Sequence, residues 1–292
     1  QDFPVSIGIL YAAFTQYLGF PYYGDEYKVM GLSPYGKPKY IEELRKIIWS
    51  GEKNILEWDS SFFKLDKPVH KYETHRPEVA ELFNVEKFES VFGKKRNIGD
   101  TLDNRHKDIA SSLQRRVEEL VFEILIRAHK KTGLKNLCIA GGVAQNSVAN
   151  GKILQNTPFE NLYIPSAGHD AGISMGAAQY YYFNDLQNKR VEPLYDANLG
   201  ISFTNIQIKQ ILDDKELKYS FKEDKELFPF VAKAISNSGV IGFFDGKAEF
   251  GPRALGSRSI LADPRNEKAQ QLLNEKIKKR ESFRPFAPSI LE

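Results

Sequence analysis

Two short apolar segments, each followed by a glycine-rich turn and then a helical pattern, constrain the fold of this chain more than any other feature. The first is 136–140 (NLCIA), followed by Gly141 and Gly142, and the second is 161–165 (NLYIP), followed by 168–172 (GHDAG). Strand, turn and helix in this order are typical of a βαβ unit with parallel strands. The sequence therefore predicts an α/β fold with both turns on one rim of a sheet.

The remaining pattern is mostly helical. The clearest helix is expected over 107–131, where apolar residues recur every three or four positions before Lys130, Lys131 and Gly133. The segment 37–100 has weak periodicity apart from one helix, and we expect it to lie outside the main core. Residues 5–20 are expected to form a buried helix or a strand followed by a helix. Further helices are expected over 41–49, 143–155, 172–182 and 205–213, with a turn at 33–36.

Composition excludes several classes of protein. The chain has 292 residues, of which 41% are hydrophobic and 27% charged, as in globular proteins with one or two cores. A net charge of +3 is too small to indicate a nucleic-acid or membrane surface. Cys138 is the single cysteine, and no apolar run approaches the roughly 20 residues of a membrane helix. We therefore expect a cytoplasmic protein.

The first glycine turn continues into GGVAQN, which contains Gly141, Gly142 and Asn146. Glycines after a strand let the main chain approach a ligand, and amides at the start of the next helix can bind phosphate or ribose. Asn146 can hydrogen-bond a sugar or a base edge. We expect a nucleotide-binding loop here, and a tight turn that serves only packing is the alternative.

The second turn begins at Gly168 and occupies the equivalent place after the next strand. Ligands bind at the carboxyl ends of parallel strands, so Gly168 is assigned to the same nucleotide site. Asp170 can cap the following helix, which is the more common use, or it can ligate a divalent cation. The five histidines include no convincing helical pair, so no complete histidine metal site is expected.

Positive charge is concentrated near the C-terminus. Residues 231–292 carry 11 Lys and Arg against 7 Asp and Glu, a net charge of +4, which leaves about −1 for the rest. Arg253 and Arg258 lie among small residues in 249–265, which leaves room for an anion beside a guanidinium group. This pattern predicts a site for phosphate-type ligands.

The same basic region continues to Lys278, Arg280 and Arg284. Lys278 and Arg280 would lie on one side if their segment were extended, whereas a solvated basic helix is the alternative for 276–280. An RNA-binding surface is disfavoured, because a charge of +4 is modest and the nearby aromatic residues alternate with prolines.

At these motifs the sequence resembles the NodU-type carbamoyltransferases, over nearly the whole chain. The run EFGPRALGSRSILADPR followed by FRPFAPS is highly specific. The matching stretches are 27–36 (YKVMGLSPYG), 108–114 (DIASSLQ), 141–146 (GGVAQN), 163–178 (YIPSAGHDAGISMGAA) and 249–288.

The resemblance implies an α/β enzyme of two modules. Residues 1–195 would form the C-terminal half of an actin/hexokinase-like ATPase fold, 196–227 a linker region, and 228–292 the beginning of a smaller α/β domain. The smaller domain would form carbamoyl-adenylate from carbamoyl phosphate and ATP. The larger one would pass the carbamoyl group to a hydroxyl of a small-molecule or sugar acceptor. Neither nucleic acid nor membrane is an implied partner, and a homodimer is left open.

The resemblance also implies roles for individual residues. They are Gly141, Gly142, Asn146 and Gly168 on the nucleotide side, Asp170 as ligand of an iron-type metal or Mg²⁺, Glu26 and Lys28 on the acceptor side, and Arg253, Lys278, Arg280 and Arg284 as catalytic cations around carbamoyl phosphate and the nucleotide phosphates.

In this family a histidine pair and the first half of the ATPase fold come before the segment that begins this chain. We therefore expect residues 1–292 to be a piece of a longer enzyme and to be inactive alone. A sugar-kinase-like ATPase or phosphotransferase is one alternative, although it would have no use for the basic segment. A non-catalytic nucleotide-binding subunit is the other.

Overall fold

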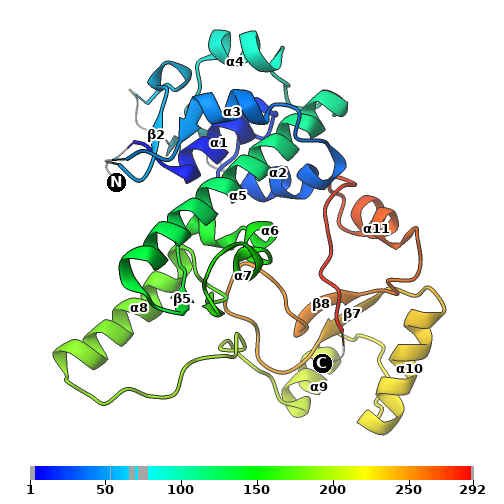
Figure 1. Ribbon diagram of the computed structural model, residues 1–292. Coiled ribbons are helices and arrows are strands. Elements are labelled where there is room, and N and C mark those ends of the chain that lie inside the picture. Colours follow the sequence, from blue (N-terminus) through cyan, green and yellow to red (C-terminus); the bar gives the residue numbers. More distant parts are fainter. Residues whose placement is uncertain (1–3, 53, 66–69, 72–77, 291–292) are drawn as a thin grey trace. The chain divides into compact units, whose positions relative to one another are not determined.

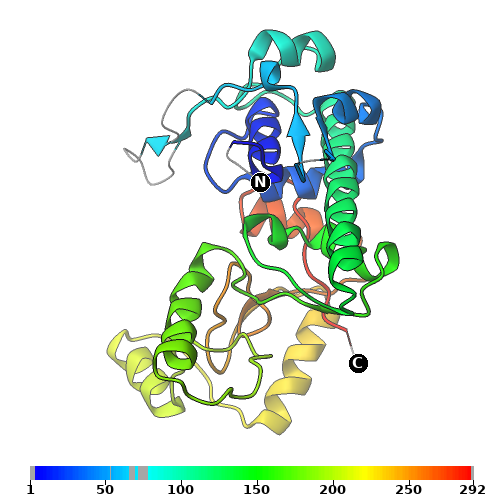
Figure 2. The same ribbon diagram turned by 60° about the vertical axis from the view of Figure 1, so that its left-hand side comes forward.

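The computed structural model describes residues 4–52, 54–65, 70–71 and 78–290, and the chain divides into two compact units (Figures 1 and 2). The first unit is Gln1–Ile164 and the second is Pro165–Glu292. The linker predicted at 196–227 lies inside the second unit, where it contains a helix. Together the described helices and small sheets form the mixed α/β architecture that the sequence predicts.

The first unit is mainly helical. Its helices are α1 (Ile7–Tyr17), α2 (Glu26–Leu32), α3 (Ile41–Ile47), α4 (Val85–Phe92), α5 (Asn104–Thr132), α6 (Ser147–Asn150) and α7 (Ile153–Asn156), with 3₁₀ turns η1 (Ser33–Tyr35), η2 (Ser60–Phe62) and η3 (Gly142–Gln145). Its strands are β1 (Ile48–Trp49), β2 (Glu57–Trp58), β3 (His70–Lys71), β4 (Glu78–Val79), β5 (Asn136–Cys138) and β6 (Asn161–Tyr163).

Helix α5 is the long axis of the first unit and contacts α1, α2 and α3 (Figure 1). It begins with a capping box in which the Asp103 side chain accepts from the amide of His106, and it ends at Gly133 with φ 66°. Ile109, Leu113 and other apolar residues of one face are fully buried. The helix predicted over 107–131 is thereby confirmed.

Aromatic side chains fill the core between α1 and α4. The ring of Phe14 lies 4.8 Å from that of Phe88 and 5.2 Å from that of Phe92, centroid to centroid, and Tyr17 lies 5.3 Å from Phe88. All four side chains are buried. The prediction that 37–100 lies outside the core is therefore wrong, because α4 buries Phe88 and Phe92, which stand four positions apart and so lie on one face of the helix.

Strands β5 and β6 pair in parallel, with Leu137 opposite Leu162, as the βαβ pattern predicts. Between them the single helix expected over 143–155 is divided into η3, α6 and α7. The division has a local cause: the Asn146 side chain accepts from the amide of Ala149 and so starts a new helix, which ends at Gly151.

The second unit holds longer irregular segments. Its elements are η4 (Asp170–Gly172), α8 (Ile173–Tyr180), the π-helical turns η5 (Tyr181–Asp185) and η6 (Leu273–Ile277), α9 (Asn205–Asp214), α10 (Asp224–Ser236), α11 (Ala269–Leu272), and the antiparallel pair β7 (Ile241–Phe244) and β8 (Arg258–Leu261). Among its described apolar residues only Ala167 and Leu273 are classed as buried. The second unit thus has a much smaller core than the first.

Candidate functional site

The glycine turn after β5 borders open space. Gly141 has φ 111°, a backbone angle that residues with a side chain rarely adopt. Among the described residues, no heavy atom lies within 4 Å of the point where a Cβ would sit on Gly141 or Gly142. Both glycines are exposed, so a ligand can reach the main chain here.

Asn146, at the end of this loop, is held by two neighbours. Its Oδ1 accepts from the amide of Ala149 and from Nε2 of Gln114, each at 3.0 Å, while its Nδ2 donates to Oε1 of Gln114 at 3.0 Å. Asn146 is 9% exposed and Gln114 3%. A buried pair of amides therefore ties the loop to α5.

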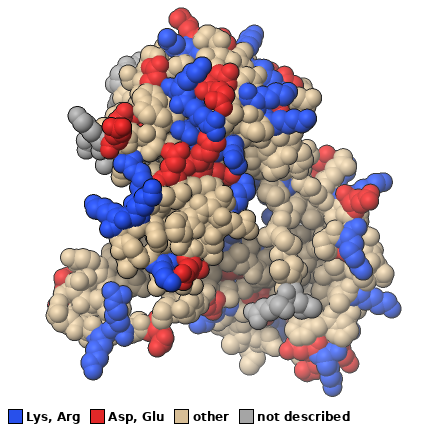
Figure 3. All heavy atoms as spheres, viewed as in Figure 1, with Lys and Arg blue, Asp and Glu red and all other residues tan. Residues whose placement is uncertain are grey.

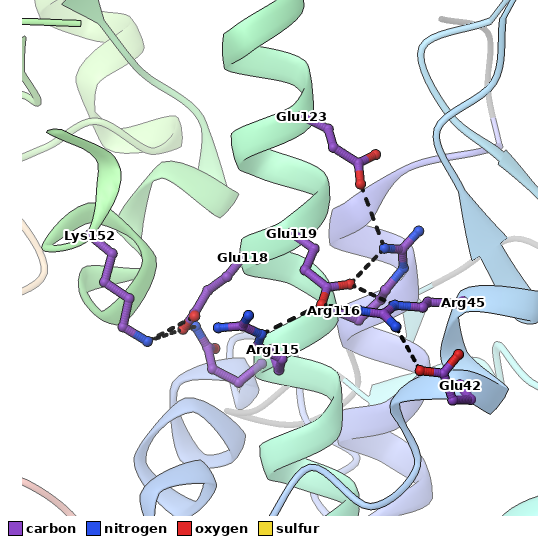
Figure 4. A network of polar contacts seen from close by, with 9 residues as sticks. Glu42, Arg45, Arg115, Arg116, Glu118, Glu119, Glu123 and Lys152 are labelled. Atoms are coloured by element: carbon purple, nitrogen blue, oxygen red, sulfur yellow. Dashed lines mark hydrogen bonds and ion pairs between the residues drawn. The ribbon is translucent and has the colours of Figure 1, made fainter. Parts of the chain in front are cut away.

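The pair belongs to a larger buried cluster, which we call the Gln114 network: Tyr11, Gln114, Glu118, Asn146 and Lys152. The hydroxyl of Tyr11 donates to Oε1 of Gln114, and Nε2 of Gln114 donates to Oε1 of Glu118, both at 3.0 Å. The ammonium of Lys152 donates to both oxygens of Glu118 at 2.8 Å (Figure 4). Four elements are joined in this way: α1, α5, α6 and the start of α7.

The electrostatics of the network follow from its burial. Burial raises the pKa of the Tyr11 hydroxyl strongly, and the carboxylates of Glu26 and Glu118 raise it further. Tyr11 therefore stays neutral and remains a hydrogen-bond donor to Gln114.

The motif DIASSLQ at the start of α5 also holds the segment after η1. Asp108 accepts from the amide of Lys37 at 2.8 Å and pairs with the Lys39 ammonium at 2.7 Å, while Oγ of Ser112 accepts from the amide of Tyr40 at 2.9 Å. Burial raises the pKa of Asp108, but the hydrogen bonds from Lys39 and Lys37 outweigh it, so the net shift is downward.

Glu26 and Lys28, assigned to the acceptor side, lie on α2. Lys28 is buried, and its ammonium pairs with Oδ1 of Asp25 at 2.9 Å and lies 5.3 Å from the centroid of the Phe20 ring. Burial raises the pKa of the Glu26 carboxyl, and the nearby Asp25 adds to the rise. Lys28 thus has an internal partner, whereas Glu26 is a carboxyl that burial biases towards its protonated form. Their assignment to the acceptor stays a prediction.

Gly168 and Asp170 lie in the second unit, Asp170 at the exposed first position of η4. A zinc- or iron-type centre needs three or four protein ligands, whereas Mg²⁺ is often held by one or two carboxylates together with substrate phosphates. Among the described residues no three His, Cys, Asp or Glu side chains come together, and His75 lies outside those residues. The assignment of Asp170 to a metal stays a prediction.

Arg253 is exposed on the loop before β8. This loop is organised by Glu249, whose Oε1 accepts from the amides of Leu255 and Ser257 at 2.7 Å. Arg258, at the start of β8, donates to main-chain oxygens, and its guanidinium carbon lies 3.6 Å from the centroid of the Phe244 ring. Arg258 therefore supports the fold, and the Arg253 side chain is exposed.

Arg280 and Arg284 come together around the buried side chain of Asn274. Nε of Arg280 donates to Oδ1 of Asn274 at 2.7 Å, and Nδ2 of Asn274 donates to the main-chain oxygen of Arg284 at 2.9 Å. The Arg280 guanidinium lies 4.8 Å from the Phe286 ring centroid, and Arg284 pairs with Glu281 at 3.3 Å. The fold itself uses part of the donor capacity of both arginines.

Lys278 ends the turn η6 with φ −85° and ψ −15°, and Lys279 has φ 47°. The segment is therefore not extended, and the one-sided arrangement of Lys278 and Arg280 is not adopted. The exposed Lys278 side chain takes no part in the described hydrogen bonds around Asn274.

A second charged network on α5 is structural. Arg116 is buried and donates to the main-chain oxygen of Ile48 and to Glu119, which also accepts from Arg45 of α3 (Figure 4). On the face shown in Figure 3, positive and negative side chains are interspersed over the first unit. These contacts attach α3 to α5 and leave the glycine loop untouched.

The sequence interpretation singled out Asn146 but not the rest of the Gln114 network. A weak signal was available, because Gln114 and Glu118 are polar residues four positions apart and each follows an apolar residue, Leu113 or Val117. Such residues lie one above the other on a helix face. The sequence alone, however, does not show that this face is buried against the loop.

The chain is similar to known proteins over nearly its whole length. The sequence matches two families, described as carbamoyltransferase N-terminus over residues 1–179 and carbamoyltransferase C-terminus over residues 232–292. An uncharacterized protein of Synechocystis sp. is 42% identical over 99% of the chain. Nodulation protein NolO of Bradyrhizobium diazoefficiens is 36% identical and nodulation protein NolNO of Sinorhizobium fredii 35%, each over 98% of the chain.

These matches cover 46%, 48% and 39% of the three relatives. The chain thus spans half or less of the length of these curated relatives. No helix in the described part of the chain has both the length and the apolar character needed to cross a membrane.

Proposed function

Because the chain belongs to the carbamoyltransferase family, as its motifs predicted, we propose that the protein carrying it transfers a carbamoyl group to a hydroxyl of a small-molecule or sugar acceptor. The carbamoyl group would come from carbamoyl phosphate through a carbamoyl-adenylate made with ATP. The observation that carries the proposal is the match of both family models to one chain. The finer fold assignment, an actin/hexokinase-like ATPase core followed by a smaller domain, is part of the same proposal.

The chemistry divides between the two family segments. Formation of the adenylate releases phosphate from carbamoyl phosphate and pyrophosphate from ATP. Fixed positive charge would stabilise the transition state of this step. The exposed Arg253 and Lys278, together with Arg280 and Arg284, are the cations available for this step. In the transfer step the acceptor hydroxyl attacks the carbamoyl carbon, the proton of the hydroxyl goes to a base and AMP leaves.

The glycine loop suits the nucleotide in this scheme. The open space beside Gly141 and Gly142 allows close approach to main-chain amides, and Asn146 is fixed at the loop's end. A nucleotide held there would be attached through its adenosine. Glu26, whose pKa burial raises, is the carboxyl proposed for the acceptor side.

The test is release of pyrophosphate from ATP by the protein of the full reading frame, with and without carbamoyl phosphate. We expect release that depends on carbamoyl phosphate, and a carbamoylated product when a hydroxyl acceptor is added. Phosphate transfer to the acceptor without carbamoyl phosphate would instead indicate the kinase-like alternative. ATP binding without any turnover would indicate a non-catalytic subunit.

Two arginine variants locate the cationic step. Arg253→Ala should lower pyrophosphate release by roughly 100-fold, the order expected when a transition-state donor is lost. Arg265→Ala is the matched control, because Arg265 is an arginine of the same basic segment that has no proposed role in the chemistry and pairs with Asp263 at 2.7 Å. Equal losses in both variants would contradict a catalytic role for Arg253.

A further inference from the structure

We propose that Gln114 is a positioning residue that presents Asn146 to the nucleotide as a hydrogen-bond donor, so that the ligand atom recognised there is an acceptor. The inference rests on the proposed nucleotide site and adds the polarity of one contact in it. It follows from which amide atoms of the Gln114 network are already occupied.

The orientation of Asn146 is fixed at one end by a main-chain amide. The N–H of Ala149 can only donate, so the atom of Asn146 that it contacts at 3.0 Å must be the oxygen. Nδ2 of Asn146 therefore faces Gln114, where it donates to Oε1 at 3.0 Å. If the Asn146 amide were flipped, its nitrogen would face the N–H of Ala149, so that two donors met and the helix cap was lost.

The orientation of Gln114 is fixed independently at the other end. The ionised Glu118 carboxylate, paired with Lys152, can only accept, so the atom of Gln114 that contacts it must be the nitrogen. Oε1 of Gln114 then faces Tyr11 and Asn146, in agreement with the orientation that Ala149 imposes. Two separate anchors thus select the same arrangement of both amides.

The hydrogen-bonding capacity of the two amides can then be counted. Gln114 donates both N–H groups, to Glu118 and Asn146, and its oxygen accepts from Tyr11 and Asn146. The Asn146 oxygen accepts from Ala149 and Gln114, which uses both lone pairs. One N–H of Asn146 remains without a partner among the described residues.

This spare N–H selects the chemistry of the ligand. It can bind a ribose hydroxyl oxygen or a ring nitrogen of the purine, and it rejects an exocyclic amino group, which also donates. Because Gln114 holds the Asn146 oxygen in place, Asn146 cannot rotate to accept from such a group without breaking the network. We infer that Asn146 reads an acceptor atom of the adenosine.

The experiment is a cycle between protein variants and ligand analogues, using calorimetric Kd values for ATP and the full-length protein. Asn146→Asp keeps an oxygen for the Ala149 amide but has no N–H to donate, and Gln114→Met keeps the volume but removes the fixed orientation. We expect ATP to bind roughly tenfold more weakly to each, as for loss of one hydrogen bond. Arg45→Met changes only the separate charged network between α3 and α5 and should change Kd less than about twofold.

The ligand arms are 2′-deoxy-ATP, 3′-deoxy-ATP, 3-deaza-ATP and 7-deaza-ATP. One of them should bind the wild-type protein roughly tenfold more weakly than ATP does, yet bind Asn146→Asp no more weakly than ATP does. That analogue identifies the ribose oxygen or the ring nitrogen as the partner. If Asn146→Asp does not fold, Gln114→Met completes the cycle.

Several outcomes overturn the inference. Losses that add for every analogue would show that Asn146 contacts none of these atoms. Equal weakening by Arg45→Met and Gln114→Met would show that the loss comes from general destabilisation of the first unit and not from the orientation of Asn146. A wild-type protein that turns over ATP but shows no coupling leaves the proposed function intact, whereas absence of ATP binding by the wild type defeats both.

Discussion

Replacing Lys152 with methionine isolates the charge that balances Glu118 inside the first unit. The Glu118 side chain is 3% exposed, and its carboxylate receives two contacts of 2.8 Å from Lys152 and one hydrogen bond from Gln114. Methionine keeps the aliphatic length of lysine but removes the cation. The carboxylate would then be buried with a single neutral donor.

The magnitude lies between two limits. Breaking a fully buried pair costs about 3–5 kcal/mol, and an exposed pair contributes about 1 kcal/mol or less. Because the Lys152 side chain is 45% exposed, solvent screens the pair and supplies part of the lost solvation. We expect Lys152→Met to lower the free energy of unfolding by about 2 kcal/mol.

The assay is urea denaturation followed by tryptophan fluorescence, because both tryptophans of the chain, Trp49 and Trp58, lie in the first unit. With a slope of about 2 kcal/mol per molar urea, the midpoint should fall by about 1 M. Adding Glu118→Gln removes the unbalanced charge, so the double variant should be more stable than Lys152→Met alone. A double variant that is equally or less stable would refute the electrostatic reasoning.

Three further predictions concern the scaffold. Gly36→Ala should lower the free energy of unfolding, measured from the urea midpoint, by about 3 kcal/mol, because the added Cβ would lie 2.0 Å from the main-chain oxygen of Lys107. Gly142→Ala, whose Cβ would meet open space, should change it by no more than about 0.5 kcal/mol. Asp108→Asn should be about 1 kcal/mol less stable at pH 7. Because the pKa of Asp108 is lowered in the folded state, its stabilisation is present above its unfolded pKa and lost as pH falls through the folded one. Denaturation curves of variant and wild type should therefore converge once the pH lies below the folded pKa. In hydrogen-exchange mass spectrometry of the chain, β7 and β8 should exchange before α5, because the second unit has fewer buried apolar residues; slower exchange of β7 would contradict this reasoning.

The sequence was sufficient to predict those elements whose caps, turns and apolar periods lie within one segment of the chain. Helix α5 was predictable because its apolar period and its terminal Gly133 lie within one segment. The parallel pair β5 and β6 was predictable because each strand is bounded by its own turn. Helix α4 was not predicted, although Phe88 and Phe92 stand at the helical spacing of four. The helix has only eight residues, too few for the period to repeat, and both rings are held by α1, which lies about 70 residues earlier in the chain.

The candidate site shows the same division. Asn146 was found from the residues next to it, since glycines after a strand mark a place where ligands approach. Its polarity depends on Gln114, which lies 32 positions earlier, and on Glu118 and Lys152, which orient Gln114 in turn. A hydrogen-bond orientation set by four elements appears only when those elements are assembled.

The basic segment shows what a count of charges in a sequence omits. Arg258 and Arg280 were both interpreted as cations for an anionic ligand, yet each donates to groups of its own fold and lies over an aromatic ring. A guanidinium group has five N–H donors, so such contacts can fix its direction and still leave donors for phosphate. Lys278, an exposed point charge outside the described Asn274 contacts, has no such preorganisation. Among the proposed cations, Arg280 is therefore oriented by the fold in a way that suits stabilisation of a transition state, whereas Lys278 is better suited to attract the anion.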